Sequence, residues 1–382
     1  MPLIFPPIPP TVLFVDAADG TLQPAVRSSD QPPGASANAG YAFGFGDLFA
    51  ATSDGFVAFS AETTVSSKQP GVYAGMPGDI RRIAGVGDSV QTALGQVELT
   101  GAGGPLLNER REIVFTASFN SGGTQFGTGA FRYDAVTGIE AILVAGEPAP
   151  GLLDGTIVTR ASIALDHNRA FSDGGFALIE ASVQRPDRDD TDQALYLARG
   201  TDLTLIAAEN WAIPGRSLRT VPEFFGFRPF LGVDSQGRGA FFASVVVADL
   251  FIRIPDALFV FDAQGRVELA LTDTDFIDIG DTAPDIRQVA AADADDIAFG
   301  EGELIITTRS AGDTIVFRVP LELPCLADQD RDGDLDIDDF SAFLVNFFSF
   351  NPTADINLDG FFDVDDFSGF VAELFDPSCD QG

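Results

Sequence analysis

Two acidic segments near the C-terminus have the residue types and the spacing of metal ligands. They read DQDRDGDLDIDD and DINLDGFFDVDD, and they start 27 residues apart, at Asp328 and Asp355. A calcium ion takes about six to eight oxygen ligands, which a tight loop supplies by pointing alternate residues inward. A glycine in the middle of each segment, Gly333 or Gly360, permits the backbone reversal that such a loop needs.

Each segment fits an EF-hand-type loop, with side-chain oxygens at positions 1, 3, 5, 9 and 12 and a backbone carbonyl at position 7. In the first loop the predicted ligands are Asp328, Asp330, Asp332, Asp334 (through its carbonyl), Asp336 and Asp339. In the second loop they are Asp355, Asn357, Asp359, Phe361 (through its carbonyl), Asp363 and Asp366. The sequence therefore predicts two structural Ca²⁺ ions.

A helix is predicted after each loop, because the apolar residues that follow recur on one helical face. These residues are Phe340, Phe343, Leu344 and Phe347 after the first loop, and Phe367, Phe370, Val371 and Leu374 after the second. The unit is a loop followed by a helix, repeated once, without the helix that precedes the loop in a full EF-hand. The alternative is an acidic, disordered tail.

The paired unit resembles the dockerin module, a calcium loop–helix repeat found at the end of many secreted bacterial proteins. The resemblance covers residues 324–382, and Asp at position 12 of both loops agrees with it. Positions 10 and 11 depart from it, because cohesin-binding dockerins carry small hydroxyl residues there and this chain has Ile337-Asp338 and Val364-Asp365. The resemblance implies docking or anchoring through a cohesin-like or cell-envelope receptor, without fixing which.

The flanking Cys325 and Cys379 look closest to dockerin variants that are abundant in planctomycetes. Since the two ends of a dockerin lie close together, the resemblance implies a disulfide between them. The alternative is two free thiols, and neither has the CxxC or histidine context of a redox or metal site.

Residues 1–323 are predicted to form a mainly β repeat domain, because short strand patterns alternate with glycine turns and a marker segment recurs. Each segment is a polar turn followed by an apolar strand, and one residue of each strand is called its marker residue. The five marker residues lie 56 to 63 positions apart and are Phe59, Phe115, Leu178, Phe241 and Phe299. The marker segments are residues 53–61, 109–117, 172–181, 235–243 and 293–301.

A repeat of about sixty residues with about four strands is typical of a propeller blade. Predicted hairpins recur after the marker segments, at residues 129–151, 194–215 and 257–273, and a leading hairpin is predicted at residues 11–34. We therefore predict a β-propeller-like domain of five blades, or of six if the leading hairpin and residues 314–323 build one together. The alternatives are an open β-solenoid or two β-sandwiches.

The marker also resembles a bacterial tandem repeat written N-x-x-G-x-x-A-F, found in secreted proteins. Residues 234–241, DSQGRGAF, match it with Asp in place of Asn. The other copies are looser, since Arg111 replaces the glycine of the second and Leu178 the phenylalanine of the third. This resemblance implies an architecture and no activity.

The charge of the chain limits its partners. The formal net charge of −35 opposes binding to nucleic acid or to an anionic membrane. No stretch approaches the eighteen or so apolar residues of a membrane span, and no signal peptide is visible at the N-terminus, MPLIFPPIPPTVLFVD. Acidic calcium loops and a cysteine pair nevertheless favour an extracellular or cell-surface location, so the start of the sequence is interpreted as truncated.

Catalytic signatures are weak. The single histidine, His167, excludes a histidine-cluster metal site and disfavours Ser-His-Asp chemistry. The sequence favours a non-enzymatic binding or scaffold protein whose repeat domain presents a surface to a protein or a glycan. The alternative is a polysaccharide-degrading enzyme, a glycoside hydrolase or lyase, with a carboxylate site in the propeller channel.

Overall fold

The structure is a computed structural model of the whole chain. It describes residues 12–16, 22–33, 39–42, 49–64, 70–121, 125–164, 169–188, 190–209, 220–221, 232–247, 252–271, 276–278, 286–288, 296–300, 302–310, 313–321, 327–329, 335–349, 354, 356 and 362–374. The chain divides into two compact units, each described by itself. The first is Met1–Ala208 with Pro229–Gly237, and the second is Glu209–Arg228 with Arg238–Gly382.

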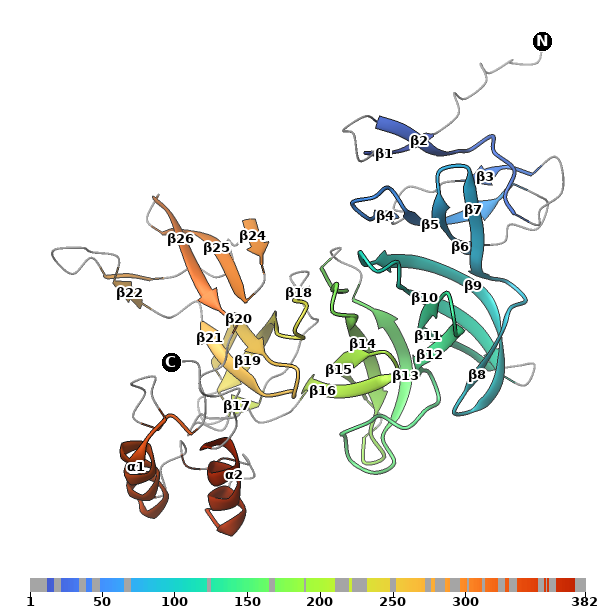
Figure 1. Ribbon diagram of the computed structural model, residues 1–382. Coiled ribbons are helices and arrows are strands. Elements are labelled where there is room, and N and C mark those ends of the chain that lie inside the picture. Colours follow the sequence, from blue (N-terminus) through green and yellow to red (C-terminus); the bar gives the residue numbers. More distant parts are fainter. Residues whose placement is uncertain are drawn as a thin grey trace. The chain divides into compact units, whose positions relative to one another are not determined.

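The first unit contains only strands among its described residues (Figure 1). They are β1 (Val12–Asp16), β2 (Leu22–Arg27), β3 (Tyr41–Ala42), β4 (Phe49–Ala51), β5 (Val57–Thr63), β6 (Pro70–Met76), β7 (Asp79–Gly85), β8 (Ser89–Thr92), β9 (Gly95–Leu107), β10 (Ile113–Ser121), β11 (Gln125–Asp134), β12 (Gly138–Val144), β13 (Ile157–Ile163), β14 (Phe176–Gln184), β15 (Thr191–Arg199), β16 (Asp202–Ala208) and β18 (Gly232–Val233).

The second unit combines strands with two helices. The strands are β17 (Thr220–Val221), β19 (Gly239–Val247), β20 (Ile252–Phe261), β21 (Val267–Leu271), β22 (Phe276–Asp278), β23 (Ile286–Gln288), β24 (Asp296–Phe299), β25 (Glu303–Ser310) and β26 (Asp313–Pro320). The helices are α1 (Ile337–Phe348) and α2 (Val364–Leu374).

The strands form successive antiparallel sheets, each built from neighbours in the sequence. One sheet takes its strands in the order β13-β14-β15-β16, another in the order β12-β11-β10-β9-β8, and a third contains β3 to β7. Such meanders of about four strands are the units of a propeller. The fold is therefore mainly β, with a β-propeller-like repeat domain and a small C-terminal helical region, as the sequence predicted.

Each predicted marker segment supplies a strand to a different sheet: β5, β10, β14, β19 and β24. The predicted hairpins are also present, as β11–β12, β15–β16 and β20–β21. The leading hairpin, β1–β2, forms a two-stranded sheet, and β26 pairs with β25.

Four marker residues are buried and face a large residue of the next strand. Phe59, Phe115, Leu178 and Phe241 are at most 2% exposed. Their cross-strand partners are Tyr73, Phe131, Leu197 and Phe259. The three aromatic pairs stack, with ring centroids 5.6, 5.8 and 5.1 Å apart. Stacked, buried pairs add directional attraction to the burial of apolar area, which fixes the register of these strands.

A tight turn precedes each of these four strands. Its first residue is a buried polar one, Thr52, Asn108, Ser172 or Asp234. The carbonyl of that residue accepts a hydrogen bond from the N–H of the residue three positions on, at 2.9–3.1 Å. This fourth residue has a φ of 64–85° and is Gly55, Arg111, Gly175 or Gly237. Glycine suits the left-handed region because it has no Cβ, so only Arg111 is strained.

Side chains reinforce the same turns. Thr52 Oγ1, Asn108 Oδ1 and Ser172 Oγ each accept from the backbone N–H four residues on, at 3.0–3.3 Å. In the first turn, hydrogen bonds from Thr52 and then from Arg111 lower the pKa of Asp54 to about 2. Arg111, the arginine in the left-handed region, therefore forms an ion pair with the ionised Asp54 of the preceding turn.

The turns also link adjacent sheets of the first unit. The backbone N–H of Ser53 donates to Glu109 Oε1 at 2.9 Å, and the N–H of Glu109 donates to Asp173 Oδ1 at 2.8 Å. These three residues occupy the same position in consecutive turns. The first of these turns therefore binds the second, and the second binds the third. The sheet of β13 to β16 also bonds to the sheet of β8 to β12, where Ile163 N–H donates to Thr116 Oγ1 at 3.0 Å.

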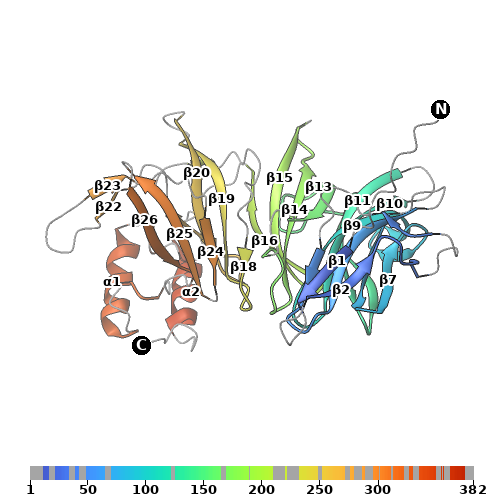
Figure 2. The same cartoon turned by 90° about the horizontal axis from the view of Figure 1, so that it is seen from above.

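The two helices lie side by side in both views (Figures 1 and 2). Phe343 of α1 and Phe370 of α2 are fully buried and stack with centroids 4.2 Å apart. The other residues of the predicted apolar faces pack around them. Phe367, although 38% exposed, has its ring centroid 6.1 Å from that of Phe343. The predicted helical period is thus confirmed.

Replacing Phe115 by alanine is expected to lower the free energy of unfolding by about 3–5 kcal/mol, because it empties a fully buried site and removes the stack on Phe131. Denaturant unfolding of the full chain measures this change. Phe126→Ala is the control, since Phe126 lies on the neighbouring strand β11 and is 78% exposed. Equal losses for the two variants would contradict a structural role for the marker stack.

Arg111→Gly is expected to leave the protein about 1 kcal/mol more stable than Arg111→Ala. Both variants remove the ion pair with Asp54 and the contact with the Phe56 ring, but alanine keeps a Cβ in the left-handed region. Thermal unfolding of the two variants gives the difference. Arg110, whose φ is not positive, is the control position. There the alanine variant is expected to be at least as stable as the glycine variant. If glycine were the more stable variant at both positions, the strain argument would be refuted.

Candidate functional site

The predicted calcium ligands are only partly among the described residues. Asp328, Asp336, Asp339, Asp363 and Asp366 are described, whereas Asp330, Asp332, Asp334, Asp355, Asn357, Asp359 and Phe361 lie outside the described residues. Cys325, Cys379 and His167 also lie outside them. The disulfide therefore stays a prediction.

The last predicted ligands of the two loops have the same environment. Asp339 and Asp366 are both fully buried. Asp339 accepts from the N–H of Gln329 at 2.7 Å and from that of Asp336 at 2.9 Å. Asp366 accepts from the N–H of Ile356 at 2.8 Å and from that of Asp363 at 2.9 Å. In both loops the donors stand ten and three residues before the carboxylate, so the described ends of the two segments have the same hydrogen-bond pattern.

These bonds draw the beginning and end of the first loop together. Gln329 follows the predicted ligand Asp328, and its N–H reaches Asp339 at the other end of the loop. Asp336 is the N-cap of α1, and its side chain accepts from the N–H of Asp338 at 2.7 Å. The bond from the Asp336 N–H to Asp339 completes a capping box. Local sequence thus fixes where the helix starts, and the helix start places Asp336 beside Asp339.

The predicted ligands are carboxylates, the oxygen donors that a hard divalent cation prefers, and Asp336 and Asp339 both lie at the start of α1. In the part of the chain that the structure describes, however, no group of three acidic, histidine or cysteine side chains could hold a metal ion. A complete coordination shell would need the central loop residues, which are not described.

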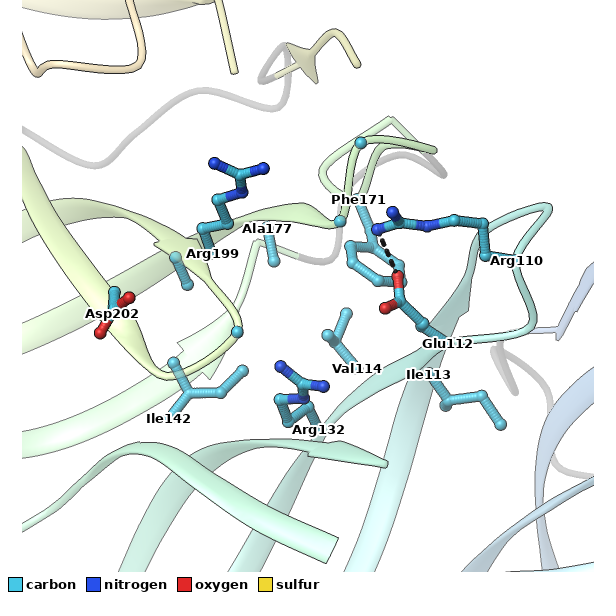
Figure 3. Close-up of a pocket in the computed structure, with 14 residues that line it drawn as sticks. Arg110, Glu112, Ile113, Val114, Arg132, Ile142, Phe171, Ala177, Arg199 and Asp202 are labelled. Atoms are coloured by element: carbon cyan, nitrogen blue, oxygen red, sulfur yellow. Dashed lines mark hydrogen bonds and ion pairs between the residues drawn. The ribbon is translucent and has the colours of Figure 1, made fainter. Parts of the chain in front are cut away.

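A pocket of about 400 Å³ lies in the first unit, between the sheet that contains β10 to β12 and the sheet that contains β13 to β16 (Figure 3). Its charged lining residues are Arg110, Arg132 and Arg199 with Glu112 and Asp202. Apolar side chains form the floor, namely Val114, Ile142, Phe171 and Ala177. Sequence reasoning missed this pocket.

The signal for the pocket is hard to see in the sequence, because its arginines come from three different strands or turns. The only signal in the sequence was the scarcity of basic residues. Lysine and arginine together number 22 against 57 acidic residues, so three arginines at one place are unusual. Their meeting depends on how the two sheets pack.

Neither helix among the described residues has the length and apolarity needed to cross a bilayer. The sheets and the paired acidic loops define the class of this protein, a β-propeller-like repeat protein with a C-terminal helical region. A family model matches residues 11–309, and the chain belongs to that family, DUF7453, a family of unknown function. No curated protein matches the sequence.

Several solved structures show a remote likeness over most of the chain. The β-propeller domain of the trilobed protease from Pyrococcus furiosus is 12% identical, with 72% of this chain and 82% of that chain covered and a TM-score of 0.27. The α-L-arabinofuranosidase Arb93A from Fusarium graminearum is 11% identical, with coverages of 79% and 82% and a TM-score of 0.32. An oligogalacturonate lyase is 11% identical, with coverages of 73% and 78% and a TM-score of 0.25. Likeness at this level carries no argument about function.

Asp339→Ala is expected to destabilise the start of α1 by about 3 kcal/mol, because two backbone N–H groups, those of Gln329 and Asp336, lose a buried, charged acceptor. Hydrogen exchange of the full chain measures this loss as faster exchange in residues 327–348. Asp338→Ala is the control, since its exposed side chain lies one position away. Unchanged exchange in Asp339→Ala would show that the carboxylate does not hold the loop.

Proposed function

We propose that this protein is an extracellular or cell-surface binding protein, docked through a calcium-dependent, dockerin-like C-terminal module. The observation that supports this most strongly is the matched environment of Asp339 and Asp366, two buried carboxylates that close equivalent loops 27 residues apart. A disordered acidic tail has no reason to repeat such bonds in register.

Calcium has a structural role in this proposal. Each loop concentrates carboxylates that repel one another until a cation neutralises them, so binding of the metal supplies folding free energy. Asp328, Asp336 and Asp339 would hold the ion in the first loop, and Asp363 and Asp366 in the second, together with the predicted ligands of the central loop segments. The bracketing cysteines, paired as a disulfide, would suit the same oxidising compartment.

Two exposed apolar side chains give the module a docking face. Ile337 is 71% exposed at the first position of α1, and Val364 is 70% exposed at the first position of α2. They occupy the same position in the two repeats, at the tenth residue of each loop. Exposed apolar residues in repeated positions favour recognition by a protein receptor, cohesin-like or attached to the cell envelope. The repeat domain would then present a surface to a protein or a glycan.

The described residues supply no observation that favours the enzymatic alternative, a polysaccharide-degrading enzyme with a carboxylate site in the propeller channel.

The full chain is expected to bind two Ca²⁺ ions, measured by equilibrium dialysis with elemental analysis, and to gain helical circular dichroism as they bind. Asp328→Ala combined with Asp355→Ala removes the first ligand of each loop and is expected to abolish both effects. Asp338→Asn, a change at an exposed acid outside the predicted ligand set, is expected to change neither. Binding of no calcium by the wild-type chain would refute the proposal.

Docking is expected to depend on the repeated apolar face. Calcium-dependent binding of the full chain to a cell-envelope fraction should fall at least tenfold in Ile337→Asp with Val364→Asp, because two charges would be buried at the interface. Val345→Asp is the matched control, since Val345 is 69% exposed on α1 but is not one of the two residues of that face. Equal binding by the double variant and the wild type would place docking elsewhere.

A further inference from the structure

The pocket between the sheet of β8 to β12 and the sheet of β13 to β16 combines three arginines, two acidic side chains and an apolar floor. It has a volume of about 400 Å³, which is within the range of small-ligand sites and is enough for about one sugar ring. The sheets on its two sides are joined by hydrogen bonds, including that from Asn108 Nδ2 to the carbonyl of Ser172 at 3.2 Å. Its walls are therefore held in place independently of any ligand.

Arg110, from the turn before β10, and Arg132, from β11, reach toward glycine turns of the sheet of β13 to β16. A Cβ on Gly175 would lie 2.3 Å from Arg110 Nη2, and a Cβ on Gly200 would lie 2.7 Å from Arg132 Nη1. Both glycines have a positive φ, of 81° and 66°. Glycine at these two turns thus leaves the space in which the guanidinium groups sit.

The same two arginines are already paired with carboxylates. Arg110 donates to Glu112 Oε2 at 2.8 Å, and Arg132 Nε lies 3.3 Å from Glu140 Oε2. The third arginine differs, because Arg199 stands over the ring of Phe176 at 5.2 Å and makes no ion pair with a described residue. Asp202 stands directly across the hairpin from Arg199, but the structure gives no ion pair between them. Among the described lining residues, Arg199 is therefore the arginine whose guanidinium has no carboxylate bonded to it (Figure 3).

The remaining lining residues determine which kind of ligand could pair with Arg199. Phe171, Ile142 and Val114 are at most 7% exposed and present an apolar floor. Glu112 and Asp202 supply oxygen acceptors, and Gly174 and Gly200 bring backbone groups to the lining. A ligand that matches all three parts has one negative charge, an apolar face and several hydroxyl donors.

We propose that this pocket binds an acidic sugar, a uronate whose carboxylate pairs with Arg199 and whose ring packs on Phe171. The planar guanidinium matches a carboxylate with two parallel N–H···O bonds. A single available cation beside two carboxylates favours a monoanion over a phosphate dianion. The proposal gives the repeat domain a glycan ligand, and it deepens the binding role proposed above.

Isothermal titration of the full chain with sodium galacturonate and with galactose tests this, in calcium-depleted buffer so that no metal bridges the sugar. The two sugars differ only at the carboxylate. We expect saturable binding of galacturonate, at least tenfold weaker binding of galactose, and at least a tenfold loss of galacturonate affinity in Arg199→Gln. Arg81→Gln is the control, because Arg81 is another exposed arginine, paired with Asp79 on a different sheet, and it should leave the affinity unchanged.

Equal affinity for the two sugars would overturn the proposal, as would an equal loss in Arg81→Gln, tighter binding of inorganic phosphate than of galacturonate, or no saturable binding. The chain with Asp328→Ala and Asp355→Ala separates this inference from the docking proposal. Its galacturonate affinity should equal that of the wild type even though calcium binding is lost.

Discussion

The turn before the marker strands β5, β10, β14 and β19 is the constraint on which the described repeat domain depends. It holds a buried polar residue whose carbonyl and side chain both bond to backbone N–H groups a few residues on. It also forces the next strand to begin at a defined residue, which places the marker residue against its partner across the sheet. Because a slip of one residue would turn the marker residue to the opposite face, turn and stack specify the register together.

The same turns connect one sheet to the next in the first unit. The side chains of Glu109 and Asp173 each accept a hydrogen bond from the backbone of the preceding turn. The polar turns therefore join neighbouring sheets, whereas the stacked rings join strands within one sheet. The arginine pocket is a consequence of this arrangement. Arg110 and Glu112 lie in and just after the second turn, and Gly174 and Gly175 lie in the third. The packing of the two sheets thereby brings charged side chains of separate strands to one place.

The C-terminal region follows a different principle, in which polar side chains inside a short repeat close their own loop. Asp339 and Asp366 are buried because each accepts two backbone N–H bonds, and those bonds also position the start of the following helix. The stacked Phe343 and Phe370 then join the two repeats. The loop carboxylates and the apolar helix faces are thus parts of one folding unit, which explains why both recur in the sequence with the same spacing.

The sequence by itself determined the features that depend on near neighbours. The spacing of Phe59, Phe115, Leu178 and Phe241 identified the marker strands, and the apolar period after each acidic loop identified both helices, because strand, turn and helix patterns act over a few residues. It also showed that Arg111 stands where the other turns have glycine. Only the tertiary structure decided which distant residues meet: the bonds between successive turns, the stack of Phe343 on Phe370, and the gathering of Arg110, Arg132 and Arg199 at one pocket. Such meetings depend on how the sheets and helices pack, and no local pattern carries that information.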